Sequence, residues 1–114
     1  MQVKYIPDCF YHSKGSGLFP SHEAICVIND HTEPVNLRIT LYFEDRDKLD
    51  GFTVQVAAER TLHIRMDKLR NDCGQGVPMD VPYAAKIEAD KEVVMQYSRM
   101  DTSQEAMSIC TTMV

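Results

Sequence analysis

The chain has 114 residues and a mass of 13.0 kDa, close to the commonest size of a single domain. Hydrophobic residues make up 44% and charged residues 25%, a globular composition that argues against an intrinsically disordered chain. The formal net charge is −5, so general binding to duplex DNA is not expected, because that affinity comes from neutralising phosphates.

Hydropathy and cysteine spacing indicate the compartment. No apolar run approaches the roughly 20 residues that span a bilayer, and residues 1–12 lack the apolar core of a signal peptide. We therefore expect a cytoplasmic protein. The four cysteines contain no C-x-x-C pair, so free thiols are expected rather than a zinc site or a disulfide framework. They are Cys9, Cys26, Cys73 and Cys110.

The first half of the chain shows short runs broken by turn residues, which is typical of an all-β protein. Residues 1–20 are weakly patterned and include a turn-rich stretch at 13–17. Residues 24–28 are continuously apolar, which predicts a strand covered on both faces. Residues 35–43 alternate between apolar and polar side chains and form the clearest predicted strand.

The middle of the chain continues the alternation. Residues 52–56 and 61–66 predict two further strands. Asp67 is expected to cap a single helical turn at 68–70. Residues 71–79 contain two glycines and one proline and are expected to form a long loop.

The last third of the chain predicts three more strands. Residues 83–88 and 92–100 flank a connection of three residues, a length typical of a hairpin. Residues 106–114 form the last predicted strand. The pattern as a whole predicts a single all-β domain over residues 1–114, a jelly-roll-like antiparallel β-sandwich of about seven or eight strands. A closed barrel needs a similar number of strands and stays open as an alternative.

Motifs of known catalytic or cofactor sites are missing from the sequence, so no cofactor is expected. Ser21, His22 and Glu23 place three reactive side chains together, but neighbours on a strand point to opposite faces, so they cannot form a triad. A metal site built from His22, Glu23 and His63 is one alternative, although that spacing is not diagnostic.

Polar side chains gather in two stripes at alternate strand positions. If the stripes meet across the sandwich or at a subunit contact, they form a site for a carboxylate, a phosphate or vicinal hydroxyls. The alternative is that both stripes are the solvated faces of half-exposed strands. The first stripe is Thr61, His63 and Arg65, and the second is Tyr97, Arg99 and Asp101.

Four sequence blocks occur in order at 21–29 (SHEAICVIN), 39–45 (ITLYFED), 60–65 (RTLHIR) and 96–104 (QYSRMDTSQ). Together they resemble the Anabaena sensory rhodopsin transducer family, over about residues 5–112. The resemblance implies a cytoplasmic all-β sandwich that assembles as a homotetramer. The founding member of that family couples to a microbial sensory rhodopsin, and many relatives are thought to bind small molecules, such as sugars or related metabolites.

The resemblance also implies candidate ligand-binding residues, half of which belong to the two polar stripes. Tyr97 joins them from the second stripe. Those implied by the family blocks are His22, Glu23, Asn29, Arg60, Thr61, His63, Arg65, Arg99, Asp101 and Gln104.

Four functions therefore stand as hypotheses. The favoured one is a non-enzymatic, ligand-binding domain with a signalling or regulatory role. The second is a soluble transducer that docks a membrane receptor, whose cytoplasmic loops are usually basic. The third is a sugar-acting enzyme with His63 or His22 as the acid or base. The fourth is a nucleic-acid binder through Arg60, Arg65 and Arg99 of a tetramer.

Overall fold

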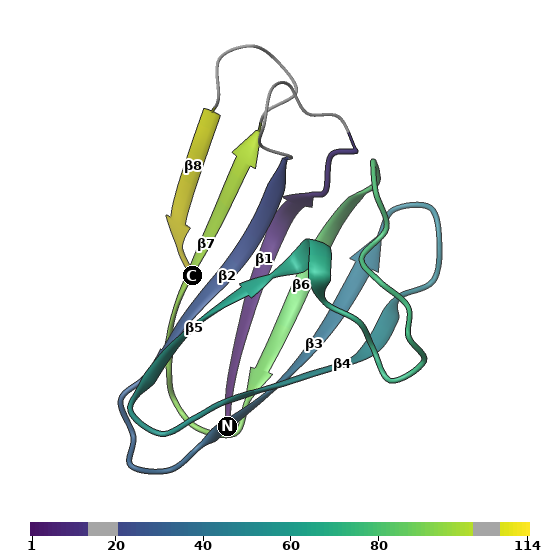
Figure 1. Ribbon diagram of the computed structural model, residues 1–114. Helices are drawn as coiled ribbons and strands as arrows, with labels where there is room; N and C mark the ends of the chain where they lie inside the picture. Colours follow the sequence, from purple (N-terminus) through teal and green to yellow (C-terminus); the bar gives the residue numbers. More distant parts are fainter. Residues whose placement is uncertain (14–20, 102–107) are drawn as a thin grey trace.

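The computed structural model describes residues 1–13, 21–101 and 108–114, without the side chains of residues 101 and 108–110. This part of the chain forms eight β-strands and one short 3₁₀ turn. The strands make two four-stranded antiparallel sheets, with the orders β1-β6-β3-β4 and β5-β2-β7-β8. Figure 1 shows the two sheets facing each other, with β8 beside β7 at one edge.

The strand bounds follow the predicted runs closely from residue 22 onward. Among the strands of the described residues, only the first is not predicted by the sequence pattern. The elements are β1 (Gln2–Phe10), β2 (His22–Asn29), β3 (Val35–Phe43), β4 (Leu49–Val56), β5 (Arg60–Arg65), η1 (Met66–Lys68), β6 (Pro82–Ala89), β7 (Val94–Asp101) and β8 (Ser108–Met113).

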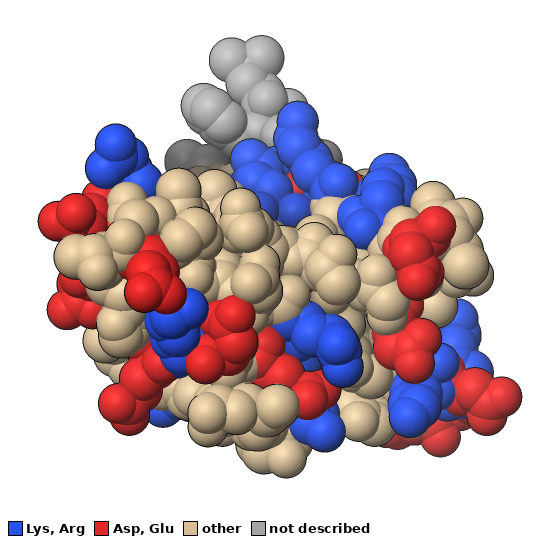
Figure 2. Space-filling view, turned by 90° about the horizontal axis from the view of Figure 1, so that it is seen from below, with Lys and Arg blue, Asp and Glu red and all other residues tan. Residues whose placement is uncertain are grey.

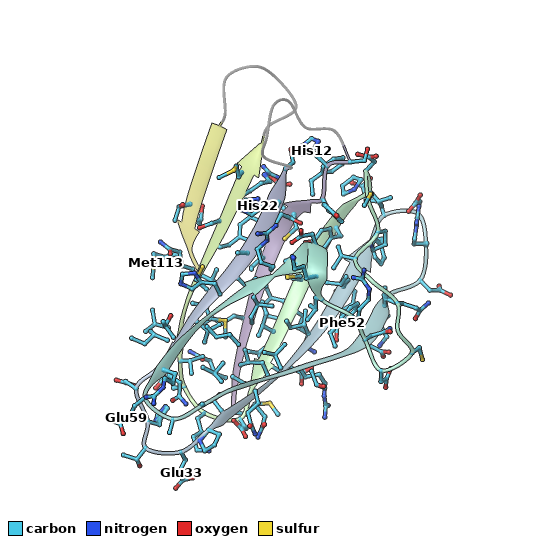
Figure 3. All side chains as sticks on the ribbon, viewed as in Figure 1. His12, His22, Glu33, Phe52, Glu59 and Met113 are labelled. Carbon is cyan, nitrogen blue, oxygen red and sulfur yellow. The ribbon has the colours of Figure 1, made fainter. Side chains whose placement is uncertain are left out.

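The predicted fold class is confirmed. The described strands form two separate antiparallel sheets, so the molecule is a sandwich and not a closed barrel. On β3 the inward side chains of Leu37, Ile39 and Leu41 are at most 2% exposed, whereas Arg38 points to solvent. Phe52 of β4 is fully buried between the sheets (Figure 3). Burial of such a side chain contributes about 1.5–3 kcal/mol.

The predicted hairpin between residues 83–88 and 92–100 is wrong. β6 lies between β1 and β3, while β7 lies between β2 and β8 in the other sheet. A short connection can close a hairpin, but it can also cross the roughly 10 Å between packed sheets. Two hydrogen bonds hold this crossing in place, because the His31 ring contacts the carbonyl oxygen of Glu92 at 2.6 Å and the N–H of Val93 donates to Gln2 at 2.9 Å.

The expectation that residues 24–28 are covered on both faces is also wrong for the single chain. Ile25 and Val27 are 1% exposed on the inner face of β2, but Ile28 on the outer face is 50% exposed. Ala24 and Cys26, which share that outer face, are half-buried. One face of this apolar strand therefore lies open to solvent.

The expected helical turn lies earlier than predicted. The 3₁₀ turn covers Met66–Lys68, is preceded by Arg65, and has no side-chain cap. Asp67 lies inside the turn, where its carboxylate pairs with the guanidinium of Arg65 at 2.8 Å. Asp67 therefore forms an ion pair and does not cap the turn as the sequence predicts.

The sequence pattern does not predict β1, because the alternation of its inward and outward side chains is interrupted. Ile6 pairs with Ala85 and Cys9 pairs with Tyr83, so two residues of β1 face one residue of β6. Such a bulge tolerates a proline, here Pro7, and shifts every later side chain by one position. Among the described residues, no helix is long and apolar enough to cross a membrane.

Candidate functional site

A fully buried carboxylate lies inside one end of the sandwich. Glu23 of β2 is 1% exposed. Its Oε1 accepts a hydrogen bond from the hydroxyl of Tyr83 at 2.6 Å, and its Oε2 accepts one from the backbone N–H of Phe10 at 2.8 Å. The hydroxyl of Tyr97 also donates to Oε2. We call these groups, together with Arg99, the polar centre.

Four strands supply the polar centre. The alternation of β2 places Glu23 on the same inner face as Ile25, and Tyr97 of β7 stands opposite Ile25. Tyr83 reaches Glu23 from β6 in the other sheet. The bulge in β1 ends at Cys9, and the following N–H of Phe10 bonds across the sandwich to Glu23. A buried charge costs several kcal/mol unless donors satisfy it, and here three donors do so.

Arg99 is the residue directly opposite Glu23 in the ladder between β2 and β7. It lies on the inner face beyond Tyr97 and is half-buried. No acceptor among the described residues hydrogen-bonds its guanidinium. A guanidinium is a rigid fork of donors whose geometry suits a carboxylate or vicinal hydroxyls.

The electrostatics of the polar centre keep its hydroxyl and thiol groups protonated. Burial raises the pKa of Tyr83 and of Tyr97, and the negative charge of Glu23 raises both pKa values further. Burial also raises the pKa of the neighbouring Cys9 thiol to about 12, with Glu23 as the second cause. The positive charge of Arg99 acts in the opposite direction on Cys9 and Tyr97. Because the thiolate is the reactive form, Cys9 is a poor nucleophile at neutral pH.

The polar centre lies at the end of the sandwich that His22 marks in Figure 3, opposite the end marked by Glu33 and Glu59. We call these the His22 end and the Glu33 end. A cavity of about 270 Å³ lies on the outer face of the sheet β1-β6-β3-β4 at the same end, where Asp8, Tyr42 and Ala84 line it. Tyr83 also lines this cavity, but its hydroxyl bonds to Glu23 on the inner side of the sheet, so the cavity and the carboxylate lie on opposite sides of that sheet.

The two predicted stripes do not meet within one chain. Thr61, His63 and Arg65 stand opposite outward-facing residues of β2, such as Cys26 opposite His63. Tyr97 and Arg99 point inward from the same sheet. Residues paired directly across strands share one face, so the first stripe lies outside the sandwich, whereas Tyr97 and Arg99 of the second lie inside it.

Several candidate residues on β5 already bond to other groups of the same chain. The Arg65 guanidinium makes two hydrogen bonds of 2.8 Å to the carboxylate of Asp67. The Thr61 hydroxyl donates to the carbonyl oxygen of Val27 at 3.1 Å. Arg60 is exposed and donates to the neighbouring carbonyl of Glu59. His63 is exposed and lines a shallow cavity of about 230 Å³ on the outer face.

The remaining predicted site residues lie at different places in the fold and do not form one site. Asn29 is fully buried and anchors turns through bonds to backbone groups, including the carbonyl oxygen of Val56 at 3.2 Å. Glu23 points inward while His22 and His63 lie on the outer face, so these three do not converge on a metal ion. Within the described ranges no group of three or more potential metal ligands occurs. The side chain of Asp101 and all of Gln104 lie outside the described residues.

Sequence reasoning missed Tyr83, Cys9 and the N–H of Phe10. One signal could have found Tyr83, because it begins the predicted strand 83–88 at an inward position, and a buried tyrosine hydroxyl needs a partner. No comparable signal exists for Phe10, because its contribution is a backbone group that the bulge in β1 redirects.

The fold and the polar centre define a small all-β protein, a two-sheet antiparallel sandwich with a hydrogen-bonded carboxylate inside one end. The family model of the Anabaena sensory rhodopsin transducer matches residues 2–114, and the chain belongs to this family. The resemblance of the four sequence blocks is thereby confirmed.

Two solved structures are similar over nearly the whole chain. The crystal structure of Thermotoga maritima 1070 is 32% identical with a TM-score of 0.86, and the match covers 97% of this chain and 90% of that one. The Anabaena sensory rhodopsin transducer is 28% identical with a TM-score of 0.76, and the match covers 90% of each chain. Comparison with curated proteins finds no match.

Proposed function

We propose that this protein is a non-enzymatic, cytoplasmic signalling domain that binds a small molecule, a sugar or a related metabolite, at the His22 end. The observation that carries the proposal is the buried Glu23 carboxylate beside the guanidinium of Arg99, to which no described residue bonds. The ligand class follows from membership of the family and from the groups present. A guanidinium fork, a carboxylate and tyrosine rings are the groups that commonly bind hydroxyl-rich ligands.

The proposed ligand residues are those that the fold brings to the His22 end. Glu23, Tyr97 and Arg99 belong to the polar centre, and His22 and Asp101 lie on the adjoining ends of β2 and β7. Arg60, Thr61, His63 and Arg65 stay predictions for the outer face. They can join the same site only if another subunit supplies them.

The chemistry of the polar centre supports binding rather than catalysis. Burial raises the pKa of the Cys9 thiol to about 12, so it is protonated at neutral pH. Both carboxylate oxygens of Glu23 already accept hydrogen bonds from the protein. Cys9 and Glu23 therefore do not form a pair of activated nucleophile and base.

A thermal-shift screen against sugars, sugar acids and phosphates tests the proposal. A ligand at about 100 times its Kd stabilises the fold by about 2.7 kcal/mol. We expect Arg99→Gln to abolish the shift of a ligand that binds at the His22 end, while Arg46→Gln in an exposed loop keeps it. A library without hits, or one in which every hit survives Arg99→Gln, overturns the proposed site.

We also propose that the domain assembles as a homotetramer, as the family resemblance implies. The outer face of the sheet β5-β2-β7-β8 supports this, because its outward side chains on β2, β7 and β8 are neutral and Ile28, Val94 and Met113 are 50%, 56% and 62% exposed. Interface cores are depleted in charged residues. The outer face of the other sheet, by contrast, carries the charges of Arg38, Lys86 and Glu88.

Light scattering tests the assembly. We expect a mass of four chains of 13.0 kDa for the wild type, and a lower mass for Ile28→Lys, which puts a charge on the neutral face. Tyr5→Lys is the matched control, since Tyr5 is 64% exposed on the other sheet. A monomeric wild type, or an equal loss of mass in both variants, contradicts the tetramer on this face.

The second candidate is a soluble transducer that docks a membrane receptor. Family membership and the net charge of −5 favour it, because receptor loops facing the cytoplasm are usually basic. A sensory rhodopsin reconstituted in nanodiscs is the probe, and binding should weaken with salt. Binding to rhodopsin nanodiscs but not to empty ones, in a protein without small-molecule hits, favours this candidate.

The nucleic-acid alternative gains no support from the charge distribution. On the face shown in Figure 2, basic and acidic side chains are interspersed, without the continuous basic stripe that duplex DNA requires. Arg60 and Arg65 bond within the chain, and Arg99 points into the sandwich.

A further inference from the structure

A polar trough crosses the outer face of the sheet β1-β6-β3-β4 at the Glu33 end, away from the polar centre. Its floor is the backbone of three paired residues, Ala89, Leu37 and Val54, whose side chains point to the core. On each strand, one polar residue precedes and one follows the floor residue. These polar residues form two walls around a cavity of about 380 Å³, which Met1 also lines. One wall is Glu88, Arg38 and Thr53, and the other is Asp90, Asn36 and Gln55.

The second wall is organised before any ligand arrives. Gln55 Nε2 donates to Asn36 Oδ1 at 3.0 Å, and Asn36 Nδ2 donates to Asp90 Oδ2 at 3.0 Å. The other carboxylate oxygen of Asp90 accepts the backbone N–H of Asn36 at 2.9 Å. These bonds fix the planes of two amides, so their remaining donors and acceptors have set directions.

The first wall keeps its polar groups available. No residue in the described part of the chain hydrogen-bonds or pairs with the guanidinium of Arg38 or the hydroxyl of Thr53. Glu88 makes a contact of 3.9 Å with Lys86, which is at the outer limit of an ion pair. The trough therefore combines one fixed wall with one wall of unused donors and acceptors.

The groups in the trough suit a neutral ligand rich in hydroxyls. Arg38 and Glu88 stand directly opposite each other, so their charges compensate. Asp90 and the N-terminal amine of Met1, which also lines the cavity, add one charge of each sign, so the lining carries no net charge. Amide, carboxylate, hydroxyl and guanidinium groups all bond to hydroxyls, and three strands span about 10 Å, the length of a disaccharide.

We propose that this trough is a second small-molecule site and that it binds a neutral saccharide. The ligand class rests on the proposed function, but the site does not, because the trough shares no residue with the polar centre. The two sites lie at opposite ends of the sandwich (Figure 3).

Nitrogen-15 NMR titration with maltose, cellobiose and lactose, each at up to tens of millimolar, tests the proposal. We expect amide shifts to cluster along the trough. Gln55→Leu keeps the volume but removes the amide, and Arg38→Gln removes the guanidinium; loss of one such hydrogen bond should weaken the apparent Kd about tenfold. Both side chains are exposed, so both variants should fold. Arg46→Gln is the matched control, because it removes a guanidinium from an exposed loop outside the trough.

The outcomes separate the two sites. Shifts along the trough that Gln55→Leu and Arg38→Gln weaken, and that Arg46→Gln and Arg99→Gln leave intact, support the trough. Shifts confined to the His22 end and lost only in Arg99→Gln overturn the trough and leave the proposed function standing. If neutral saccharides cause no amide shifts at all, the trough proposal is overturned too. The proposed function is then tested by the sugar acids and phosphates of the thermal-shift screen.

Discussion

Glu23 and Arg99 lie directly opposite each other on β2 and β7, yet the carboxylate bonds to two tyrosine hydroxyls and a backbone N–H rather than to the guanidinium. Hydrogen bonds to Glu23 therefore join β2 to the other three strands of the polar centre, β1, β6 and β7. The arrangement stabilises the contact between the sheets without using the guanidinium of Arg99.

Replacing Glu23 with glutamine should destabilise the fold by about 1–3 kcal/mol, because the amide nitrogen cannot accept a hydrogen bond and leaves a buried donor unsatisfied. Urea unfolding followed by circular dichroism measures the loss. Glu33→Gln is the control, since the Glu33 side chain is 72% exposed and its change should stay within about 0.5 kcal/mol. Equal effects of the two substitutions contradict a structural role for the polar centre.

Stability should fall as the pH rises above 9. Burial, with Glu23 as the second cause, raises the pKa of Cys9 from 9.0 to about 12, and burial raises the pKa of Tyr83 and Tyr97 above 10.0. Between pH 9 and 12 the unfolded chain loses these protons while the folded chain keeps them, so the stability present below pH 9 is lost progressively.

Urea unfolding at pH 7, 9 and 11 checks this dependence on pH. Cys9→Ala and Tyr83→Phe each remove one group whose pKa is raised, so each should flatten the decline in the free energy of unfolding. Tyr5→Phe is the control, because Tyr5 is 64% exposed. If the free energy of unfolding declines with pH at the same slope in all three variants, groups other than Cys9 and Tyr83 cause the decline.

Sequence periodicity predicts the strands well, because alternate burial on β3 and β7 follows from one face packing on the core. It fails where pairing is decided at long range. The connection after Ala89 can close a hairpin or cross the sandwich, and only the tertiary contacts of His31 and Gln2 decide between them. Glu23, Tyr97 and Arg99 were predicted as site residues, but that they face away from His63 follows only from the strand pairing.

Arg65 should contribute to stability rather than to ligand binding. Its guanidinium makes both of its 2.8 Å bonds to Asp67 within the chain, and the side chains are 35% and 13% exposed. Removing a partly exposed pair of this kind costs about 1 kcal/mol or less. Arg65→Ala should therefore lower the unfolding midpoint slightly and keep the thermal shift of any hit. Loss of the thermal shift at unchanged stability would restore Arg65 to the ligand site that the family blocks imply.

Asn29 should be needed for folding, although the family blocks imply a ligand role for it. Its Nδ2 donates to the carbonyl oxygens of Glu33, Val56 and Ala57 at 2.9–3.2 Å, and its Oδ1 accepts the N–H of His31 at 2.9 Å. Asn29→Ala leaves these backbone groups without partners, so we expect a loss of roughly 2–4 kcal/mol.

Two comparisons make the Asn29 prediction decisive. Asn29→Asp keeps the acceptor for His31 but turns a negative charge toward three carbonyl oxygens, so it should also destabilise the fold. Asp30→Ala changes the exposed neighbour and should stay within about 0.5 kcal/mol. Because Asn29 lies at the opposite end of β2 from Glu23, a variant that still folds should keep ligand binding at the His22 end. Wild-type stability combined with lost binding would instead identify Asn29 as a ligand residue.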